Sequence, residues 1–288
     1  MPVRFGLSVN QYAGQGADPV GDAQHAEQLG FDIVTVSDHL VGRRPTFETW
    51  TLLTWMAAAT SRIRLGTNVL GLPYRHPAVT AKMAETLHRL SGDRFVLGLG
   101  GGGTDAEFEA FGLPVRPPRE KIDAFEEALG IVRRLWTEES VTFEGRHYSV
   151  RDASIDPRPE RPIPLWLGTY GPRALRLTGR LADGWIPSFP FAPPETWREM
   201  RDEVRRAAED SGRDPSEIEF AYNVGVRIDG TGPTRRPIVT GTPDEVAETL
   251  AGFVRDGVTL VNVWPVGEAR ELAERFASEV APAVRDAA

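Results

Sequence analysis

Two short segments of this chain carry groups that could do chemistry, and the first is Ser-Asp-His at 37–39. It directly follows residues 32–36, an apolar run typical of a buried strand. A carboxylate beside an imidazole at a strand end can orient or polarise a ring nitrogen, as general acid–base catalysis requires. A structural role fits equally well, with Asp38 capping the loop and His39 making local hydrogen bonds. Asp38 and His39 are therefore the candidate catalytic residues.

The second segment, residues 165–185, predicts a binding site for a phosphate group. Leu165–Leu167 has the pattern of a buried strand, a glycine-containing turn follows, and Pro172 suits the first position of a helix. This order directs free backbone N–H groups and the positive end of the helix dipole toward one point. A simple connection between strand and helix is the alternative. The candidate phosphate contacts are Thr169, Tyr170, Gly171, Pro172 and Arg173.

Two further strand ends offer backbone, rather than side chains, to a ligand. The polar Asn68 interrupts an apolar run, which predicts a bulge or a strained peptide that redirects the backbone. Four consecutive glycines begin at Gly100, so a flat ring could lie against bare backbone there. A plain strand end and a flexible linker are the respective alternatives. The candidate ring contacts are Asn68, Val69, Gly100, Gly101 and Gly102.

All of these residues follow strand-like segments in a chain whose strand and helix patterns alternate from end to end. Such alternation predicts βα units and a parallel sheet. The predicted strands lie at 3–9, 32–36, 64–70, 94–99, 165–167, 184–186, 219–227 and 258–263. We expect one α/β domain over residues 1–288, a (β/α)₈ TIM barrel with an inserted region at about 137–164, and a doubly wound open sheet is the alternative. In a TIM barrel the active site lies at the carboxyl ends of the strands, where these candidates would meet.

Composition narrows the classes of function. The chain has no cysteine, which removes disulfides and thiolate chemistry, and its five histidines show no metal-ligand spacing, so we expect no metal. The net charge of −8 argues against nucleic-acid binding. No apolar run is long enough to span a membrane and no signal-peptide layout is present, so we expect a cytoplasmic protein. A barrel hydrolase is disfavoured because Asp38 has no clear partner carboxylate.

Taken in order, these motifs resemble the luciferase-like monooxygenase family, in particular its branch of oxidoreductases that use the deazaflavin coenzyme F420. The matching pieces are Ser-Asp-His at 37–39, Gly-Thr-Asn-Val-Leu at 66–70, Arg-Phe-x-Leu-Gly-x-Gly at 94–100, Ala-Phe-Gly at 110–112, and Leu-Gly-x-x-Gly-Pro-x-Ala-Leu with Ala-Asp-Gly-Trp across 167–185. Each piece is modest, but together they are specific and span nearly the whole chain. The resemblance implies a barrel of the bacterial-luciferase type with short insertions, usually as a homodimer.

The resemblance also implies roles for the candidate residues. Asp38 and His39 would lie beside the cofactor ring, and His39 would polarise or protonate the reacting system. The Asn68–Val69 pair matches a bulge in which a non-proline cis peptide backs the ring. Residues 100–102 would lie beneath the ring, and residues 169–173 would bind its phosphate. The implied reaction is hydride transfer between F420 and an unidentified small organic substrate. FMN is the alternative cofactor, which would make the protein an FMN-dependent monooxygenase working with a separate flavin reductase.

Two departures from the family pattern concern the substrate. The sugar-phosphate dehydrogenases of this branch carry a glutamate acid where Gly103 stands, and a tryptophan where Arg43 and Arg44 stand. These departures argue against a sugar phosphate of that kind, and they leave open a barrel that binds its cofactor without turnover. Arg173 and Arg176 could begin a basic rim for the acidic tail of F420. The candidate pocket walls are Arg43, Arg44, Trp50, Tyr74, Trp185 and Phe189.

Overall fold

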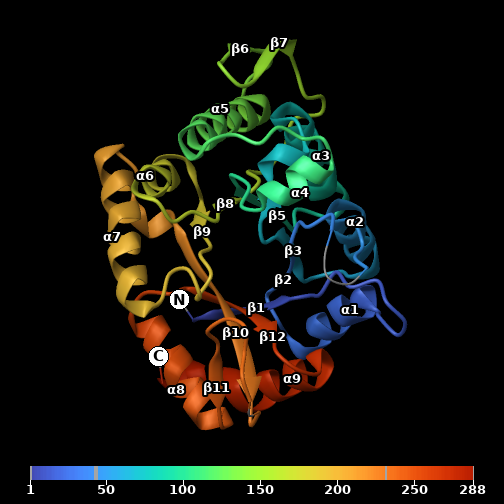
Figure 1. The fold of residues 1–288 in the computed structure, drawn as a ribbon, viewed down its shortest axis with the longest axis vertical. Coiled ribbons are helices and arrows are strands. Elements are labelled where there is room, and N and C mark those ends of the chain that lie inside the picture. The colour runs from blue at the N-terminus through green and yellow to red at the C-terminus, as the bar shows by residue number, and fades with distance from the viewer. Residues whose placement is uncertain (1, 42–44, 231, 288) are drawn as a thin grey trace.

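The computed structural model describes residues 2–41, 45–230 and 232–287, and its centre is a closed barrel of parallel strands (Figure 1). Neighbouring strands follow the order β10, β12, β1, β2, β3, β5, β8, β9, and β9 pairs with β10 to close the barrel. The barrel strands are β1 (Arg4–Ser8), β2 (Ile33–Val36), β3 (Arg64–Thr67), β5 (Phe95–Gly100), β8 (Leu165–Leu167), β9 (Gly184–Trp185), β10 (Glu219–Ile228) and β12 (Leu260–Pro265). This closure confirms the predicted TIM barrel and excludes the open sheet.

Helices surround the barrel and follow its strands. They are α1 (Pro19–Leu29), α2 (Thr49–Ala59), α3 (Pro77–Leu90), α4 (Asp105–Ala110), α5 (Pro118–Thr137), α6 (Pro172–Leu181), α7 (Pro194–Asp210), α8 (Pro243–Arg255), α9 (Ala269–Arg275) and α10 (Ala281–Ala287), with 3₁₀ turns at Leu72–Tyr74 and Pro215–Glu217 and a π-helical turn at Phe276–Val280. Two short strands, β4 (Leu70–Gly71) and β11 (Val239–Gly241), extend the sheet. The antiparallel pair β6 (Val141–Glu144) and β7 (Ser149–Ala153) forms a hairpin inside the predicted insertion.

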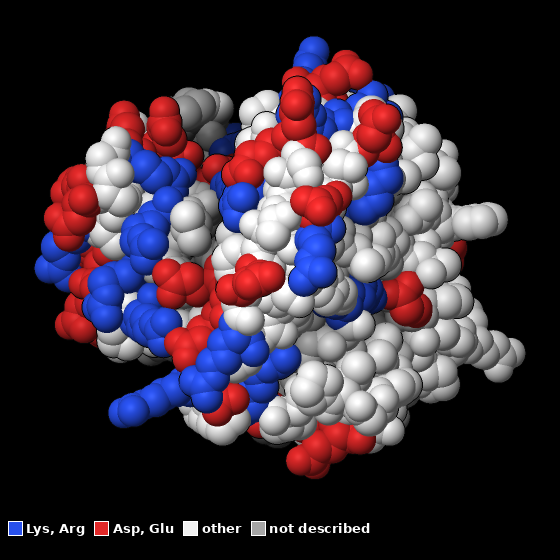
Figure 2. All heavy atoms as spheres, turned by 90° about the horizontal axis from the view of Figure 1, so that it is seen from above, with Lys and Arg blue, Asp and Glu red and all other residues white. Residues whose placement is uncertain are grey.

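The outer surface of the molecule differs between its two sides. Over α6 and α7, on the left of Figure 2, side chains of both charges crowd together, whereas the side on which Figure 1 places α2 and α3 shows few charged atoms. The sequence of α2 contains no charged residue. No helix in the described ranges is long and apolar enough to cross a membrane.

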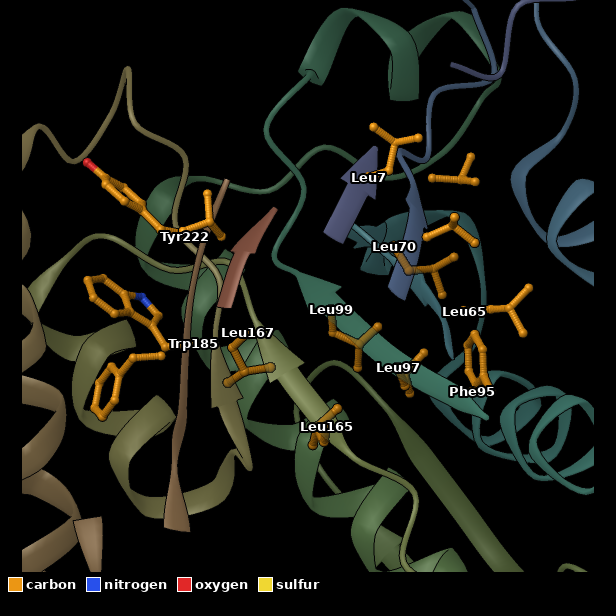
Figure 3. Close-up of a cluster of buried hydrophobic side chains, with 14 of the residues drawn as sticks. Leu7, Leu65, Leu70, Phe95, Leu97, Leu99, Leu165, Leu167, Trp185 and Tyr222 are labelled. Carbon is orange, nitrogen blue, oxygen red and sulfur yellow. The ribbon is translucent and has the colours of Figure 1, made fainter. Parts of the chain in front are cut away.

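The alternation of residues along β5 explains where the core lies. Phe95, Leu97 and Leu99 point out of the barrel and are buried under the surrounding helices (Figure 3). The intervening positions face inward and become smaller toward the carboxyl end, from Val96 to Gly98 and Gly100. Because successive strand residues point to opposite faces, this pattern builds an apolar outer layer and leaves space at the mouth of the barrel.

Inside the barrel an apolar layer lies below a polar one. The apolar layer consists of Ile33, Val96, Trp166, Ile186, Ala221 and Leu260. Above it, an uncharged hydrogen-bonded chain crosses the barrel: Asn262 donates to Thr35 at 3.0 Å and to Asn223 at 2.9 Å, and Asn223 donates to Ser188 at 3.0 Å. Buried polar groups must be paired in this way, and the chain fixes the side chains beneath the mouth.

Candidate functional site at the mouth of the barrel

The backbone bulges at the mouth, between β3 and β4. Both of these strands pair with β5, and residues 68–69 fill the interval between them. The Asn68–Val69 peptide bond is cis. The Asn68 N–H donates to the Val36 carbonyl at 2.8 Å, which ties the bulge to the end of β2. The bulge and the cis peptide predicted for this position are therefore present.

The Val69 side chain fills space that three glycines leave empty. A Cβ atom added to Gly100 would lie 2.6 Å from Val69 Cγ2, and one added to Gly168 would lie 3.1 Å from Val69 Cγ1. At Gly98 an added Cβ would also collide with the backbone, 1.9 Å from the Thr67 carbonyl oxygen. Glycine is thus required on β5 and after β8 because Val69 packs between them, and together they form a smooth platform.

The loop that follows β5 continues this platform with bare backbone. A Cβ atom added to Gly101 or Gly103 would meet no atom within 4 Å. Gly102 has a φ of +89°, a conformation that glycine adopts without steric cost, and its carbonyl accepts from Lys121 Nζ at 3.3 Å. The loop therefore has open space beside Gly101 and Gly103, and Lys121 holds it in place through the Gly102 carbonyl. A flat ring can approach it closely, and the ring contacts predicted at residues 100–102 remain a prediction.

The turn between β8 and α6 offers backbone N–H groups at the same mouth. Gly171 is the N-cap of α6 and Pro172 begins the helix, with no side-chain cap. The N–H groups of the first turn therefore have no intrahelical partner and are suited to an anion. The Tyr170 hydroxyl accepts from the Ser188 N–H at 3.0 Å, which leaves its own hydrogen available as a donor.

Two of the predicted phosphate donors direct their side chains elsewhere. The Thr169 hydroxyl is buried and shares a 2.7 Å hydrogen bond with the Thr178 hydroxyl. Arg173 forms ion pairs with Asp123 and Glu126 on α5, at 2.5 and 3.2 Å. These side chains would have to leave their partners to reach a phosphate, so the turn supplies backbone groups and Tyr170.

The predicted basic rim for an acidic tail is neutralised by its neighbours. Arg176 pairs with Glu203 at 3.1 Å, as Arg173 pairs with acidic residues on α5. Exposed pairs of this kind contribute little to stability, but they cancel the local charge. The sequence reveals the arginines of α6 and not the carboxylates that face them from α5 and α7.

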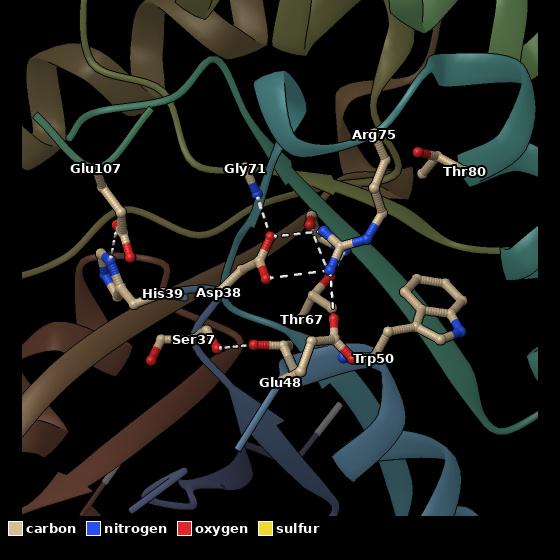
Figure 4. A network of polar contacts seen from close by, with 12 residues as sticks. Ser37, Asp38, His39, Glu48, Trp50, Thr67, Gly71, Arg75, Thr80 and Glu107 are labelled. Carbon is tan, nitrogen blue, oxygen red and sulfur yellow. Dashed lines mark hydrogen bonds and ion pairs between the residues drawn. The ribbon is translucent and has the colours of Figure 1, made fainter. Parts of the chain in front are cut away.

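Asp38 lies at the centre of a buried ion-pair network (Figure 4). Its Oδ2 atom accepts from the Gly71 N–H and from the Arg75 guanidinium, both at 2.9 Å, and its side chain is fully buried. Arg75 also contacts Glu48 at 2.5 Å. Burial alone would lower the pKa of Arg75, but the two carboxylates raise it above its ordinary value. Asp38 therefore holds the β4 segment to the end of β2, and this closed network argues against its predicted role in proton transfer.

His39 points away from that network, toward the open mouth. Its side chain is 52% exposed, and its Nδ1 atom lies 3.1 Å from Oε2 of Glu107 on α4. Its Nε2 atom makes no hydrogen bond within the part of the chain that the structure describes. Figure 4 shows the pair separated from the Asp38–Arg75 network. His39 is therefore the better candidate for proton transfer, and Glu107 was hidden from sequence analysis in a segment with a simple helical pattern.

A cavity of about 230 Å³ opens at the carboxyl ends of β1, β2 and β12 and extends between α1 and α9. Trp264 forms one wall, and its indole lies over Gly225, where an added Cβ would come within 2.4 Å of the ring. Ser8, Asn10 and Ser37 supply polar groups. Trp264 was not predicted as a site residue, although it continues the inward-facing alternation of residues 260 and 262 along β12.

The only lysine or arginine among the described residues lining this cavity is Arg270. Arg270 is already paired with Asp18 at 2.9 Å and with Asp22 at 2.6 Å. Two carboxylates therefore face one guanidinium at this end of the cavity. The described lining of the cavity contains no unpaired lysine or arginine.

Several of the predicted pocket walls pack against other aromatic side chains. Trp50, Trp185 and Phe189 each lie against another aromatic ring, with centroids 5.4 to 6.0 Å apart, and Trp185 is fully buried. Arg43 and Arg44 lie outside the described residues. Full burial argues against Trp185 as a pocket wall, because an aromatic near a strand end can serve the outer layer as readily as the mouth. Trp50 and Phe189 remain predictions.

A model of the luciferase-like monooxygenase family matches residues 3–232, which is most of the chain and contains the whole platform and the α6 turn. The chain belongs to this family. A relative from Kineococcus radiotolerans, an F420-dependent glucose-6-phosphate dehydrogenase, is 30% identical over 99% of this chain and 98% of its own. A second relative is the phthiodiolone/phenolphthiodiolone dimycocerosates ketoreductase of Mycobacterium bovis, 37% identical over 72% of this chain and 52% of its own.

Solved structures support the same fold for this family member. An F420-dependent secondary alcohol dehydrogenase superposes with a TM-score of 0.88 at 21% identity, covering 99% of this chain and 100% of the other. The F420-dependent tetrahydromethanopterin reductase of Methanopyrus kandleri gives a TM-score of 0.83 at 22% identity, covering 98% and 99%. With the family match and the curated relatives, the chain is an enzyme of the luciferase-like family and an oxidoreductase.

Proposed function

We propose that this enzyme transfers a hydride between F420 and a small uncharged organic substrate, an alcohol or the corresponding carbonyl compound. The observation that carries the proposal is the layout of the mouth. An open glycine platform, free N–H groups at the start of α6 and an exposed histidine lie around one opening. The relative from Kineococcus radiotolerans supports F420 rather than FMN as the cofactor.

The residues at the mouth fit such a cofactor. The platform of Val69 and residues 101–103 suits a flat ring, and the N–H groups after Gly171 with the Tyr170 hydroxyl suit its phosphate. When bound, the cofactor accepts or supplies a hydride at its ring. The protein contributes orientation and proton transfer. As the carbinol carbon gives up its hydride, the hydroxyl proton passes to Nε2 of His39 and a carbonyl forms, and reduction reverses both transfers.

The lining of the cavity at the carboxyl ends of β1, β2 and β12 supports an uncharged substrate. Its one described cation, Arg270, is held by Asp18 and Asp22, so no guanidinium or ammonium in the described lining is available for a phosphate. A buried or half-buried phosphate without a cationic partner would be strongly disfavoured. The Trp264 face and the hydroxyls of Ser8 and Ser37 instead suit an aliphatic body with one hydroxyl or carbonyl group.

We expect tight binding of F420 and weak binding of FMN, measured by fluorescence-quenching titration of the purified protein with each cofactor. Oxidised F420 should then lose its absorbance with 2-butanol or cyclohexanol and keep it with glucose 6-phosphate. Tight FMN binding with weak F420 binding would replace the proposal with the FMN-dependent monooxygenase. Binding of neither cofactor would overturn the use of the platform and of the α6 turn.

We further propose that two copies of the enzyme associate through the outer faces of α2 and α3, the sparsely charged side in Figure 2. Trp55 on α2 is 69% exposed, and Val79 and Leu90 on α3 are 54% and 76% exposed. Large exposed apolar side chains gathered on one side of a molecule mark an interface. Trp55→Glu should therefore convert a dimer into a monomer in size-exclusion chromatography with light scattering. The matched variant Phe191→Glu, on the opposite side, should leave the dimer intact. A monomeric parent protein would contradict this proposal.

A further inference from the structure

The side chain of Glu107 is a buried carboxylate that faces the candidate catalytic histidine. It is only 4% exposed, whereas the His39 side chain against it is half exposed. One oxygen, Oε1, accepts from the Val41 N–H at 2.6 Å, and the other, Oε2, lies 3.1 Å from Nδ1 of His39. The two bonds divide the oxygens between the loop backbone and the imidazole, so the carboxylate has one orientation.

The surroundings of α4 hold that orientation. Phe108, the next residue along, is buried against Tyr74 with ring centroids 4.9 Å apart. Lys121 on α5 contacts both Asp105, at the start of α4, and the Gly102 carbonyl in the loop before it. These contacts fix both α4 and the loop that leads into it. Glu107 cannot turn away from His39 unless they break.

The ionisation state of the Glu107 carboxylate decides which ring nitrogen of a neutral His39 carries the proton. Burial alone would raise the pKa of Glu107, but the hydrogen bonds from the Val41 N–H and from His39 lower it below its ordinary value. An ionised carboxylate only accepts hydrogen bonds, so the proton of a neutral His39 must be on Nδ1. The lone pair is then on Nε2, which is the ring nitrogen left open at the mouth.

We infer that Glu107 is a positioning residue that fixes the Nδ1–H form of His39 and turns Nε2 toward the substrate as the proton acceptor. Alcohol oxidation needs an unprotonated ring nitrogen beside the hydroxyl, and carbonyl reduction needs the same nitrogen protonated. One fixed orientation serves both directions. The tautomer follows from the contacts and from the ionised state of Glu107, whereas its catalytic use rests on the proposed function.

The variant Glu107→Gln separates this role from a purely structural one. The Gln carbonyl oxygen replaces Oε1 and keeps the bond from the Val41 N–H. Its NH₂ group then faces Nδ1 of His39, and because an amide NH₂ only donates, the proton of a neutral His39 must move to Nε2. The loop contact is preserved while the tautomer is inverted. A residue that merely held the loop would leave the imidazole unchanged.

The tautomer can be read from ¹⁵N chemical shifts of the imidazole rings in the cofactor-free protein, at about pH 9, above the ordinary titration range of histidine. The signals of His39 are those lost in His39→Ala. His88 provides an internal reference, because its Nδ1 lies 3.1 Å from the Phe95 carbonyl, which only accepts, whereas its Nε2 lies 3.4 Å from Asp93 and makes no hydrogen bond to a described residue. We expect Nδ1–H for His39 in the parent protein and Nε2–H in Glu107→Gln. An Nε2–H form in the parent overturns the inference, even if the variant fails to fold, and so does an unchanged tautomer in a folded variant.

The catalytic use of the tautomer has its own measurement. Glu107→Gln should lower kcat about 10- to 100-fold, the range that loss of an outer-shell histidine partner costs at metal sites, with little change in the Kd for F420. The matched control is Asp93→Asn, which removes a carboxylate 3.4 Å from His88 at the amino end of the barrel and should leave kcat unchanged. An inverted tautomer with parental kcat would remove Glu107 and the Nε2 proton transfer from the mechanism. Lack of any F420 turnover in the parent would instead reject the proposed function and leave the tautomer result standing.

Discussion

Replacing His39 with alanine should lower kcat about 100- to 10,000-fold, the usual contribution of a general acid or base. The reason is that Nε2 of His39 is the exposed imidazole nitrogen at the mouth, while the neighbouring carboxylate of Asp38 is closed off by Gly71 and Arg75. The Kd for F420 should change by less than about tenfold, or about 1.4 kcal/mol, because the platform and the α6 turn do not involve the imidazole.

The measurement is the rate of F420 absorbance loss with the alcohol that the parent enzyme oxidises, alongside a fluorescence titration of each variant. His147→Ala is the matched control, because that histidine lies between the strands of the β6–β7 hairpin, outside the mouth. It should retain the parental kcat. Equal turnover by His39→Ala and the parent would remove His39 from the mechanism.

Replacing Arg75 with methionine should lower the free energy of unfolding by about 3–5 kcal/mol, because it leaves the Asp38 carboxylate buried without a counter-ion. Asp38 has no exposed side-chain surface, and Arg75 itself is only 13% exposed. Methionine preserves much of the side-chain volume, so the loss reports the charge rather than the packing. Urea denaturation followed by circular dichroism gives the value directly.

Two controls define the origin of that loss. The double variant Asp38→Asn/Arg75→Met should recover much of the stability, because no unpaired charge then remains and the Asn oxygen still accepts from the Gly71 N–H. Arg176→Met breaks an exposed pair with Glu203 and should cost at most about 1 kcal/mol. A similar small loss for Arg75→Met would show that Asp38 reaches solvent and that the network is not closed.

The barrel could be predicted from the sequence because each strand carries its own evidence. Short apolar runs at regular intervals, each before a helical pattern, specify βα units without knowledge of their partners. The platform was predictable for the same reason, since the glycines after Gly100 and the bulge at Asn68 are local features. Even so, the reason for Gly100 lies in Val69, which meets it only through pairing of β4 with β5.

The parts of the site that failed prediction depend on contacts between distant segments. Glu107 lies 68 residues from His39, and nothing in a six-residue helical pattern indicates which side chain faces a strand end. Arg173 had the right type for a phosphate contact, but carboxylates on α5 hold its guanidinium. Asp38 is likewise a residue type common in catalysis, but its side chain is fully buried and paired with Arg75, as in a structural role. Residue type indicates which chemistry is available, and only the fold shows which groups are still free to do it.

The two halves of the mouth are built from different strands. The platform rests on β3, β5 and β8, the cavity opens over β12, β1 and β2, and they share no lining residue among those described. Substitutions that reshape the cavity should therefore leave the platform, the proposed cofactor side, untouched. On the proposed function, an ancestor with this layout could acquire new substrates one side chain at a time while keeping the same cofactor.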